Sequence, residues 1–163
     1  MRDSHHLFGK ADRVSGLVLR VYLDNCVSNR PYDRPSNVRI INGANAKMAI
    51  QRAIDCGKLE LATSFMLVTE NGKCPNRAAR EYNLDFIARN KAVYISRIEK
   101  ESFRPLVDEI ASKGIKAADA THIACAIVSK SAYLVTTDDR MLKLNDPRIK
   151  IMSPTAMVYM SEV

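Results

Sequence analysis

Short apolar runs alternate along the chain with longer stretches in which apolar residues recur every three or four positions. The first run, residues 17–23, is rich in branched side chains and ends at Asp24, which is typical of a buried strand. Residues 38–56 then show helical spacing before Gly57, and Ser64 is the predicted N-cap of a later helix. By the same criteria we predict further strands at 59–63, 92–95, 133–136 and 149–152, and helices at 65–70, 78–87, 102–113, 117–130, 138–143 and 154–160.

This alternation of strands and helices predicts the fold class. Strands joined through helices form right-handed βαβ units, and such units build a parallel sheet that is covered on both faces. We therefore expect an α/β protein with three layers, α/β/α, around a central parallel sheet of four to five strands. Residues 1–16 lack periodicity and predict a flexible N-terminal arm, which leaves residues 17–163 as one domain.

The composition narrows the classes of partner. No run approaches the ~18 consecutive apolar residues of a membrane helix, and the N-terminus lacks the apolar stretch of a secretory signal. We expect no membrane partner and a cytoplasmic location. Lys and Arg number 25 against 18 Asp and Glu, and the resulting charge of +7 permits an acidic partner such as nucleic acid without identifying one.

Acidic residues stand at several strand ends and helix starts, where ligands of parallel sheets bind. An ionised Asp119 in an apolar helix needs a cation or a lysine nearby. Several carboxylates in one crevice repel one another unless a divalent ion neutralises them, and oxygen-only ligands suit Mg²⁺ or Mn²⁺. The alternative is that these residues cap helices or are simply solvated. The four candidates are Asp24, Glu70, Asp119 and Asp138.

Three segments resemble those of a known family. The stretch VYLDNCVSNRPYD resembles the opening of PIN-domain proteins, and SFMLVTEN lies where that family keeps its second acidic residue. The segment GIKAADATHIACAIVSKSAYLVTTDDRMLKL is very similar to the second half of PIN ribonucleases of the VapC toxin type. The resemblance covers residues 18–152 in the same order and spacing, and it implies a PIN-like fold.

The resemblance also implies a function and a set of site residues. It implies a Mg²⁺- or Mn²⁺-dependent endoribonuclease, the toxin of a type II toxin-antitoxin pair, with an RNA substrate, a cognate antitoxin and a homodimer. Candidates for orienting these carboxylates from behind are Asn25, where the family often has a hydroxyl residue, and Thr136 and Thr137, which offer such a hydroxyl. Asp139 is a rival of Asp138 for the fourth position. The implied catalytic residues and metal ligands are Asp24, Glu70, Asp119 and Asp138.

Two rival functions remain open on the sequence alone. One is a PIN nuclease of housekeeping RNA processing that has no antitoxin. Growth arrest on induced expression, relieved by the product of a neighbouring small gene, distinguishes the toxin from this nuclease. The other is a catalytically silent PIN scaffold that binds RNA or protein, and the complete acidic set argues against it.

Basic residues offer candidates for RNA binding. Residues 73–104 contain eight basic and four acidic side chains, so this segment carries a surplus of four positive charges. Lys73, Arg77 and Arg80 lie where they could follow a phosphate backbone near the second acidic residue. Arg30 could reach a phosphate or an antitoxin carboxylate. For each of them a solvated surface position is the alternative.

His122 follows Asp119 by three residues and shares its helix face. This spacing allows a role as ligand or general base. The alternative, which we prefer, is a hydrogen-bonded histidine in the core.

Overall fold

The central sheet has five strands, all parallel, in the order β3-β2-β1-β4-β5. The computed structural model describes residues 18–25, 27 and 38–161, so the predicted arm at 1–16 and Arg30 lie outside the described residues. The parallel sheet predicted from the sequence is confirmed, with the higher of the two expected strand numbers. The strands are β1 (Leu19–Leu23), β2 (Leu59–Ser64), β3 (Lys91–Ile95), β4 (Tyr133–Val135) and β5 (Lys150–Met152).

The central strand β1 is buried on both faces. Val21 and Leu23 pack into one hydrophobic core, while Tyr22 points into the other. On either side of β1, Tyr22 is in register with Ala62 of β2 and Leu134 of β4. A strand that is covered on both faces needs a continuous apolar run, which is what residues 19–23 provide apart from Arg20.

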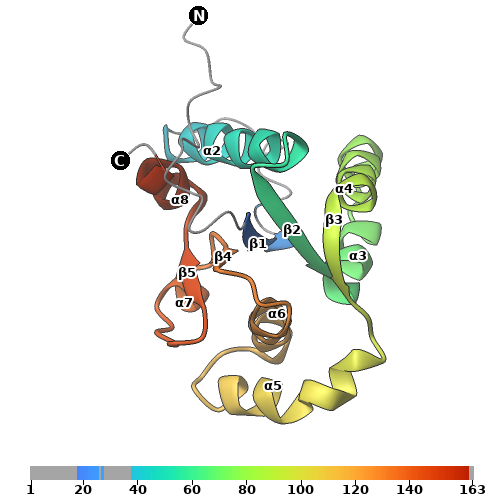
Figure 1. Ribbon diagram of the computed structural model, residues 1–163, viewed down its shortest axis with the longest axis vertical. Coiled ribbons are helices and arrows are strands. Elements are labelled where there is room, and N and C mark those ends of the chain that lie inside the picture. Colours follow the sequence, from blue (N-terminus) through green and yellow to red (C-terminus); the bar gives the residue numbers. More distant parts are fainter. Residues whose placement is uncertain (1–17, 26, 28–37, 162–163) are drawn as a thin grey trace, which may run out of the picture.

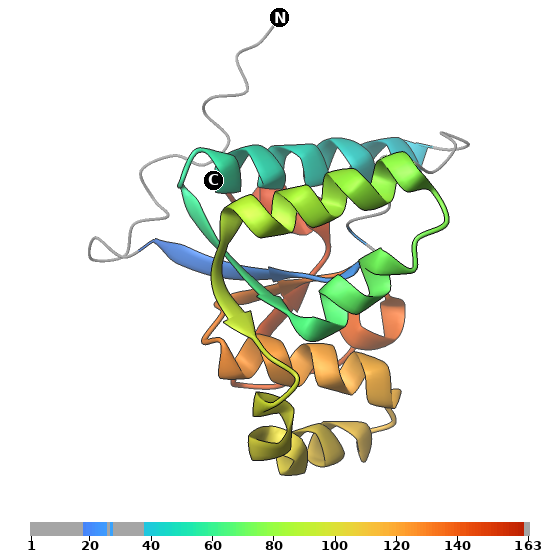
Figure 2. The same cartoon turned by 90° about the vertical axis from the view of Figure 1, so that its right-hand side faces the viewer.

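Helices cover both faces of the sheet, as Figures 1 and 2 show. Over one face lie α2 (Val38–Asp55) and α8 (Pro154–Ser161), with α4 (Arg77–Asn90) beside α2. Over the other face lie α6 (Ala117–Val128) and α5 (Arg104–Ala111). The three-layer α/β/α architecture is therefore confirmed. None of the helices in the described part of the chain is both long and apolar enough to cross a membrane.

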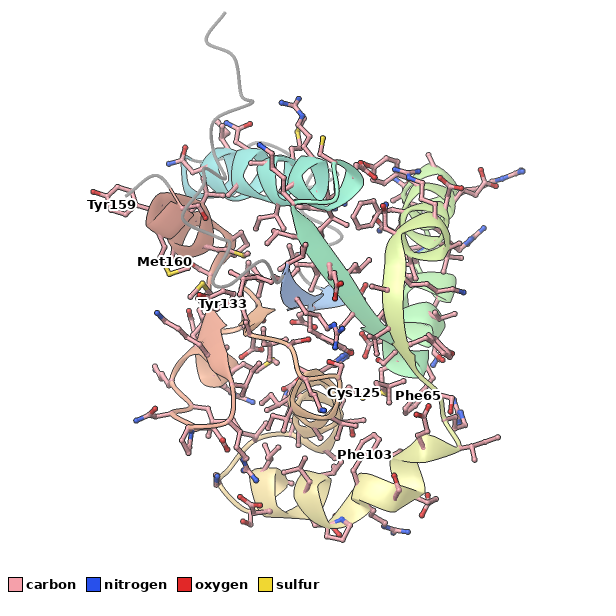
Figure 3. All side chains as sticks on the ribbon, viewed as in Figure 1. Phe65, Phe103, Cys125, Tyr133, Tyr159 and Met160 are labelled. Carbon is pink, nitrogen blue, oxygen red and sulfur yellow. The ribbon has the colours of Figure 1, made fainter. Side chains whose placement is uncertain are left out.

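The core beneath α6 is built from residues far apart in the sequence. Figure 3 shows Phe65, Phe103 and Cys125 gathered between the sheet edge, α6 and the segment leading into α5, and all three belong to one cluster of buried side chains. Residues 120–126 of α6 are all buried, as the apolar character of this helix predicted. Phe65 opens α3 (Phe65–Gly72), so this core also fixes the helix that carries Glu70.

Two local features differ from the sequence-based expectation. The single helix expected at 102–113 is instead a 3₁₀ helix, η4 (Glu99–Phe103), followed by α5. Pro105 lies in the first turn of α5, where its missing N–H costs nothing, so the α-helix begins there. Ser64 occupies the predicted N-cap position of α3, but its hydroxyl makes no capping hydrogen bond; it forms a hydrogen bond of 2.6 Å with the Tyr22 hydroxyl.

A buried carboxylate ties α5 to the loop before β5. The Asp146 side chain is fully covered and accepts hydrogen bonds from Arg148 Nη2 at 2.6 Å, from Arg148 Nε at 2.8 Å and from Lys113 Nζ at 3.3 Å. Arg148 also contacts Glu109 of α5 at 2.8 Å. The hydrogen bonds from Arg148, strengthened by Lys113, hold the pKa of Asp146 well below its usual range.

We predict that Asp146→Asn lowers the free energy of unfolding by about 2 kcal/mol at pH 7, because it removes charged hydrogen bonds from a buried site. A pKa lowered in the folded state stabilises the fold above the ordinary Asp value of about 4 and loses this effect as the pH falls through the folded pKa. The gap between wild type and variant should therefore shrink below about pH 4. Urea denaturation at pH 7 and pH 3 measures this difference in the free energy of unfolding. The control is Asp108→Asn, because Asp108 is an exposed residue of α5. A gap that does not depend on pH would contradict this account.

Candidate active site

The strand order reverses between β1 and β4, at the position where α/β sheets bind ligands. Asp24 follows β1 directly, and its backbone N–H donates to the Val135 carbonyl of β4 at 2.9 Å. Thr136 follows β4, with its backbone N–H bonded to Met152 of β5 at 3.0 Å. The sheet therefore brings the ends of β1 and β4 together, with Asp24 on one and Thr136 on the other.

Asp24 is buried, with 5% of its surface exposed. The Thr136 hydroxyl donates to Asp24 Oδ2 at 2.8 Å, and the Asn25 backbone N–H donates to Oδ1 at 2.7 Å. Within the described residues Asp24 forms no ion pair. A carboxylate that is removed from water and has only two neutral donors as partners would be stabilised further by a nearby cation.

The residues predicted to orient the carboxylates differ in the contacts they make. Position 25 has no hydroxyl group in this sequence. Thr136 supplies one instead, because its hydroxyl donates directly to the Asp24 carboxylate. Asn25 contributes its backbone N–H, while its side-chain oxygen is buried with no hydrogen-bond partner. Thr137 is partly buried, and Asp139 is exposed in the first turn of α7 (Asp139–Leu142).

Asp138 is anchored by backbone groups. Its N–H donates to the Thr136 hydroxyl at 3.1 Å, and its Oδ1 accepts from the N–H groups of Arg140 and Met141 at 2.7 and 3.2 Å. Asp138 therefore caps α7, as the structural alternative proposed. The cap orients the carboxylate and keeps it beside the end of β4, which favours Asp138 over Asp139 as the fourth acidic position.

Asp119 is only partly buried, so the expectation of a carboxylate enclosed in an apolar helix was wrong. The residue lies in the first turn of α6, where Ala117 and Ala118 are exposed. Partial burial, followed by the charges of Asp138 and Asp24, raises the pKa of Asp119. The charges of His122 and Lys116 oppose this effect. The carboxylates after β1 and before α7 thus act on Asp119 in α6.

Glu70 is connected to this group through His122. The His122 Nε2 atom lies 3.1 Å from Glu70 Oε1, and its Nδ1 atom lies 2.8 Å from the Tyr22 hydroxyl. His122 is 2% exposed, so it is the hydrogen-bonded core histidine that we preferred. Burial lowers its pKa, but the hydrogen bond with Glu70 and the charges of Asp24 and Asp119 raise it overall.

Sequence reasoning missed the buried polar residues behind the carboxylates. Tyr22 occupies an apolar position of β1 and Ser64 ends β2, yet both hydroxyls join the hydrogen bonds that lead to Glu70. The signal for Tyr22 was a polar atom in a strand that is otherwise apolar and buried, because a buried phenol needs a hydrogen-bond partner. Nothing in the local pattern distinguished Ser64 from a helix cap.

The donor set fits a hard divalent cation. All four candidate side chains offer carboxylate oxygens, which Mg²⁺ and Mn²⁺ prefer, and the repulsion felt by Asp119 is the kind that a cation relieves. Within the part of the chain that the structure describes, no three His, Cys, Asp or Glu side chains are close enough to hold one ion. Binding of one ion by three of these carboxylates therefore requires some side-chain movement.

The predicted RNA-binding residues lie at the end of α3 and the start of α4. Lys73 is exposed after Glu70. Arg77 forms an exposed ion pair of 2.7 Å with Glu81, and Arg80 donates to the Cys74 carbonyl at 2.9 Å. Only part of the positive charge of this surface is therefore free of a carboxylate partner.

Comparison with solved structures identifies the fold. One similar structure is VapBC2 from Rickettsia felis bound to a DNA fragment from their promoter; the identity is 15%, the match covers 83% of this chain and 98% of that chain, and the TM-score is 0.52. Another is FitAB bound to an IR36 DNA fragment, with 16% identity, 83% and 95% coverage and a TM-score of 0.52. No family model and no curated protein matches the sequence. The chain shares the fold of these proteins, and the predicted PIN-like architecture is confirmed.

We predict that Asp119→Asn raises the melting temperature of the metal-free protein, because it removes one of several repelling charges. The gain should stay below about 1 kcal/mol, since the side chain is partly solvated. A carboxyl whose pKa is raised by folding destabilises the fold above that pKa, so the advantage of the variant should be largest at pH 7 and shrink toward pH 4. Thermal unfolding in EDTA measures it, with Asp108→Asn as control.

The same experiment with added Mn²⁺ tests the assignment further. Wild type should gain about 2.7 kcal/mol at a hundredfold excess over the dissociation constant, and the Asp119→Asn variant should gain much less. A variant that is less stable than wild type in EDTA, and equally so with Mn²⁺, would show that Asp119 is a structural cap.

Proposed function

We propose that this protein is a metal-dependent endoribonuclease of the PIN type that hydrolyses RNA phosphodiester bonds. The observation that carries the proposal is the burial of Asp24 at the switch point of the sheet without an ion pair among the described residues, beside Asp119, whose pKa is raised by partial burial, followed by the charges of Asp138 and Asp24. Helix capping accounts for the position of Asp138 but not for that of Asp24 and Asp119 beside it. A site for a divalent cation and a phosphate accounts for all three.

The residues that would bind the cation are Asp24, Glu70, Asp119 and Asp138. When bound, Mg²⁺ or Mn²⁺ lowers the pKa of a coordinated water and stabilises the charge that develops on the phosphate. Thr136 orients Asp24, and the backbone of α7 orients Asp138. None of the four carboxylates needs to act as a covalent nucleophile, and hydrolysis of this type leaves 5′-phosphate and 3′-hydroxyl ends.

We further propose that the protein is the toxin of a type II toxin-antitoxin pair and that it forms a homodimer restrained by a cognate antitoxin. Support comes from the shared fold with VapBC2 and FitAB and from the sequence motifs that resemble VapC toxins. An RNA substrate agrees with the net charge of +7.

The first test is RNA cleavage by the purified protein with Mg²⁺ or Mn²⁺. We expect Asp24→Asn to lower the rate by more than the roughly 100-fold that loss of an outer-shell partner costs, because the amide loses the charge that holds the cation. The amide oxygen can keep the hydrogen bond from Thr136, while the amide NH2 group no longer accepts from the Asn25 N–H, so circular dichroism has to show that the variant is folded. Asp108→Asn should cleave like wild type. Full wild-type activity in excess EDTA would contradict the proposal.

The second test concerns the predicted RNA-binding surface. We expect Arg77→Ala combined with Arg80→Ala to weaken RNA binding and to reduce the slope of log affinity against log salt by ~0.7 for each phosphate that the variant no longer neutralises. Arg104→Ala is the matched control, because Arg104 is also exposed and pairs with a nearby carboxylate, that of Glu101 in η4. If the double variant keeps the wild-type slope, this surface is only solvated.

A further inference from the structure

A continuous hydrogen-bonded chain runs from the core of the sheet to the candidate site. The Tyr22 hydroxyl of β1 is fully buried and lies 2.6 Å from Ser64 Oγ of β2 and 2.8 Å from His122 Nδ1 of α6. His122 Nε2 in turn lies 3.1 Å from Glu70 Oε1 of α3. The Tyr22 and His122 rings also meet edge to face, with 5.9 Å between their centroids. Four separate elements therefore join in one chain of hydrogen bonds that ends on a carboxylate.

The Glu70 carboxylate fixes one donor in this hydrogen-bonded chain. A carboxylate only accepts, so His122 Nε2 carries a proton and donates it to Glu70. Burial raises the pKa of the Tyr22 phenol well above its ordinary value, so the phenol keeps its proton at neutral pH. The phenol can donate to one of its two partners, His122 Nδ1 and Ser64 Oγ, and accept from the other, so every polar atom along the hydrogen-bonded chain is satisfied.

Glu70 differs from the other candidate ligands in how it is held. Asp24 accepts from a hydroxyl and a backbone N–H, and Asp138 accepts from two backbone N–H groups of α7. Glu70 has the longest of the four side chains and 30% of it is exposed, yet within the described residues its side chain has only the His122 contact. A flexible carboxylate with one partner depends on that partner for its orientation.

We propose that Tyr22 and His122 are positioning residues that hold the Glu70 carboxylate in the orientation in which it binds the catalytic cation. The inference rests on the proposed function, because it assigns a role toward the cation of that same site. His122 acts here through Glu70 and not as a ligand, since its two ring nitrogens are already engaged. The buried Tyr22 fixes the orientation of the ring through its contact with Nδ1.

Two substitutions at position 122 separate this role from packing. The amide nitrogen of Gln can take the place of Nε2 and keep a donor to Glu70, whereas the amide of Asn corresponds to Nδ1 and keeps only the Tyr22 contact. Positioning of Glu70 predicts that His122→Gln retains metal affinity and His122→Asn loses it. A purely structural histidine, needed for its contact with Tyr22, predicts the opposite order.

The experiment is a titration of the purified full-length protein with Mn²⁺, followed by water proton relaxation, which reports binding without any cleavage. We expect affinity for Mn²⁺ about 10- to 100-fold weaker in His122→Asn, near wild type in His122→Gln, and reduced by a smaller factor in Tyr22→Phe. Thr121→Ala is the control: it removes a buried hydroxyl that bonds Ala117 on the same helix, and its affinity should match wild type.

A double variant keeps the inference falsifiable if a single substitution disturbs folding. If His122 acts only through Glu70, then adding His122→Asn to Glu70→Gln should cause no further loss of Mn²⁺ affinity beyond that of Glu70→Gln alone. Additive losses, or equal affinities in the Asn and Gln variants, would overturn the positioning role while wild-type binding upholds the proposed metal site. Wild type that binds no Mn²⁺ would overturn the proposed function itself.

Discussion

The burial of a carboxylate at the end of the central strand is the constraint on which the candidate site depends. Asp24 follows a strand that is covered on both faces, so its carboxylate is removed from water. Neighbouring groups must compensate the lost hydration. The compensation comes from Thr136, at the end of the adjacent strand β4. The same hydroxyl accepts a hydrogen bond from the backbone N–H of Asp138, so a single side chain contacts the Asp24 carboxylate after β1 and the backbone of Asp138 after β4. The pairing of β1 with β4 thus sets both the point where the strand order reverses and the distance between the residues of the site.

Most of the fold could be predicted from the sequence because it follows from local periodicity. Each strand begins and ends within two residues of its predicted bounds, since short branched runs between helices leave few alternatives. The break at Pro105 was missed because apolar spacing continues across it. The acidic residues were found through motifs, but the burial of Asp119 was misjudged, since its helix projects its first turn into solvent. The contact between Tyr22 and His122 joins residues 100 positions apart, and no local pattern encodes such a pair.

The distribution of positive charge limits how the proposed RNA could approach. The basic segment after Glu70 contains arginines that already pair with neighbours, such as Arg77 with Glu81 and Arg89 with Asp55 and Asp85. An exposed pair of this kind contributes little to stability and is readily exchanged for a phosphate. Lys116 directly precedes α6 and its charge acts on Asp119, so a positive side chain also lies near the acidic group. The net charge of +7 can therefore attract RNA, which is a polyanion, toward a site that is itself acidic.

Fold stability and the proposed activity place opposite demands on the same side chains. Asp138 caps α7 and Asp24 joins β1 to β4, so both carboxylates stabilise the fold while their charges raise the pKa of Asp119. A carboxylate that could turn away would relieve this repulsion, but Thr136 and the backbone N–H groups hold two of the three in place. This repulsion favours binding of a divalent cation, because the cation would remove the cost, although three of the carboxylates reach one ion only after some side-chain movement. The hydrogen bonds that hold Asp24 and Asp138 near Asp119 would thus limit how far the site has to rearrange when it binds a cation.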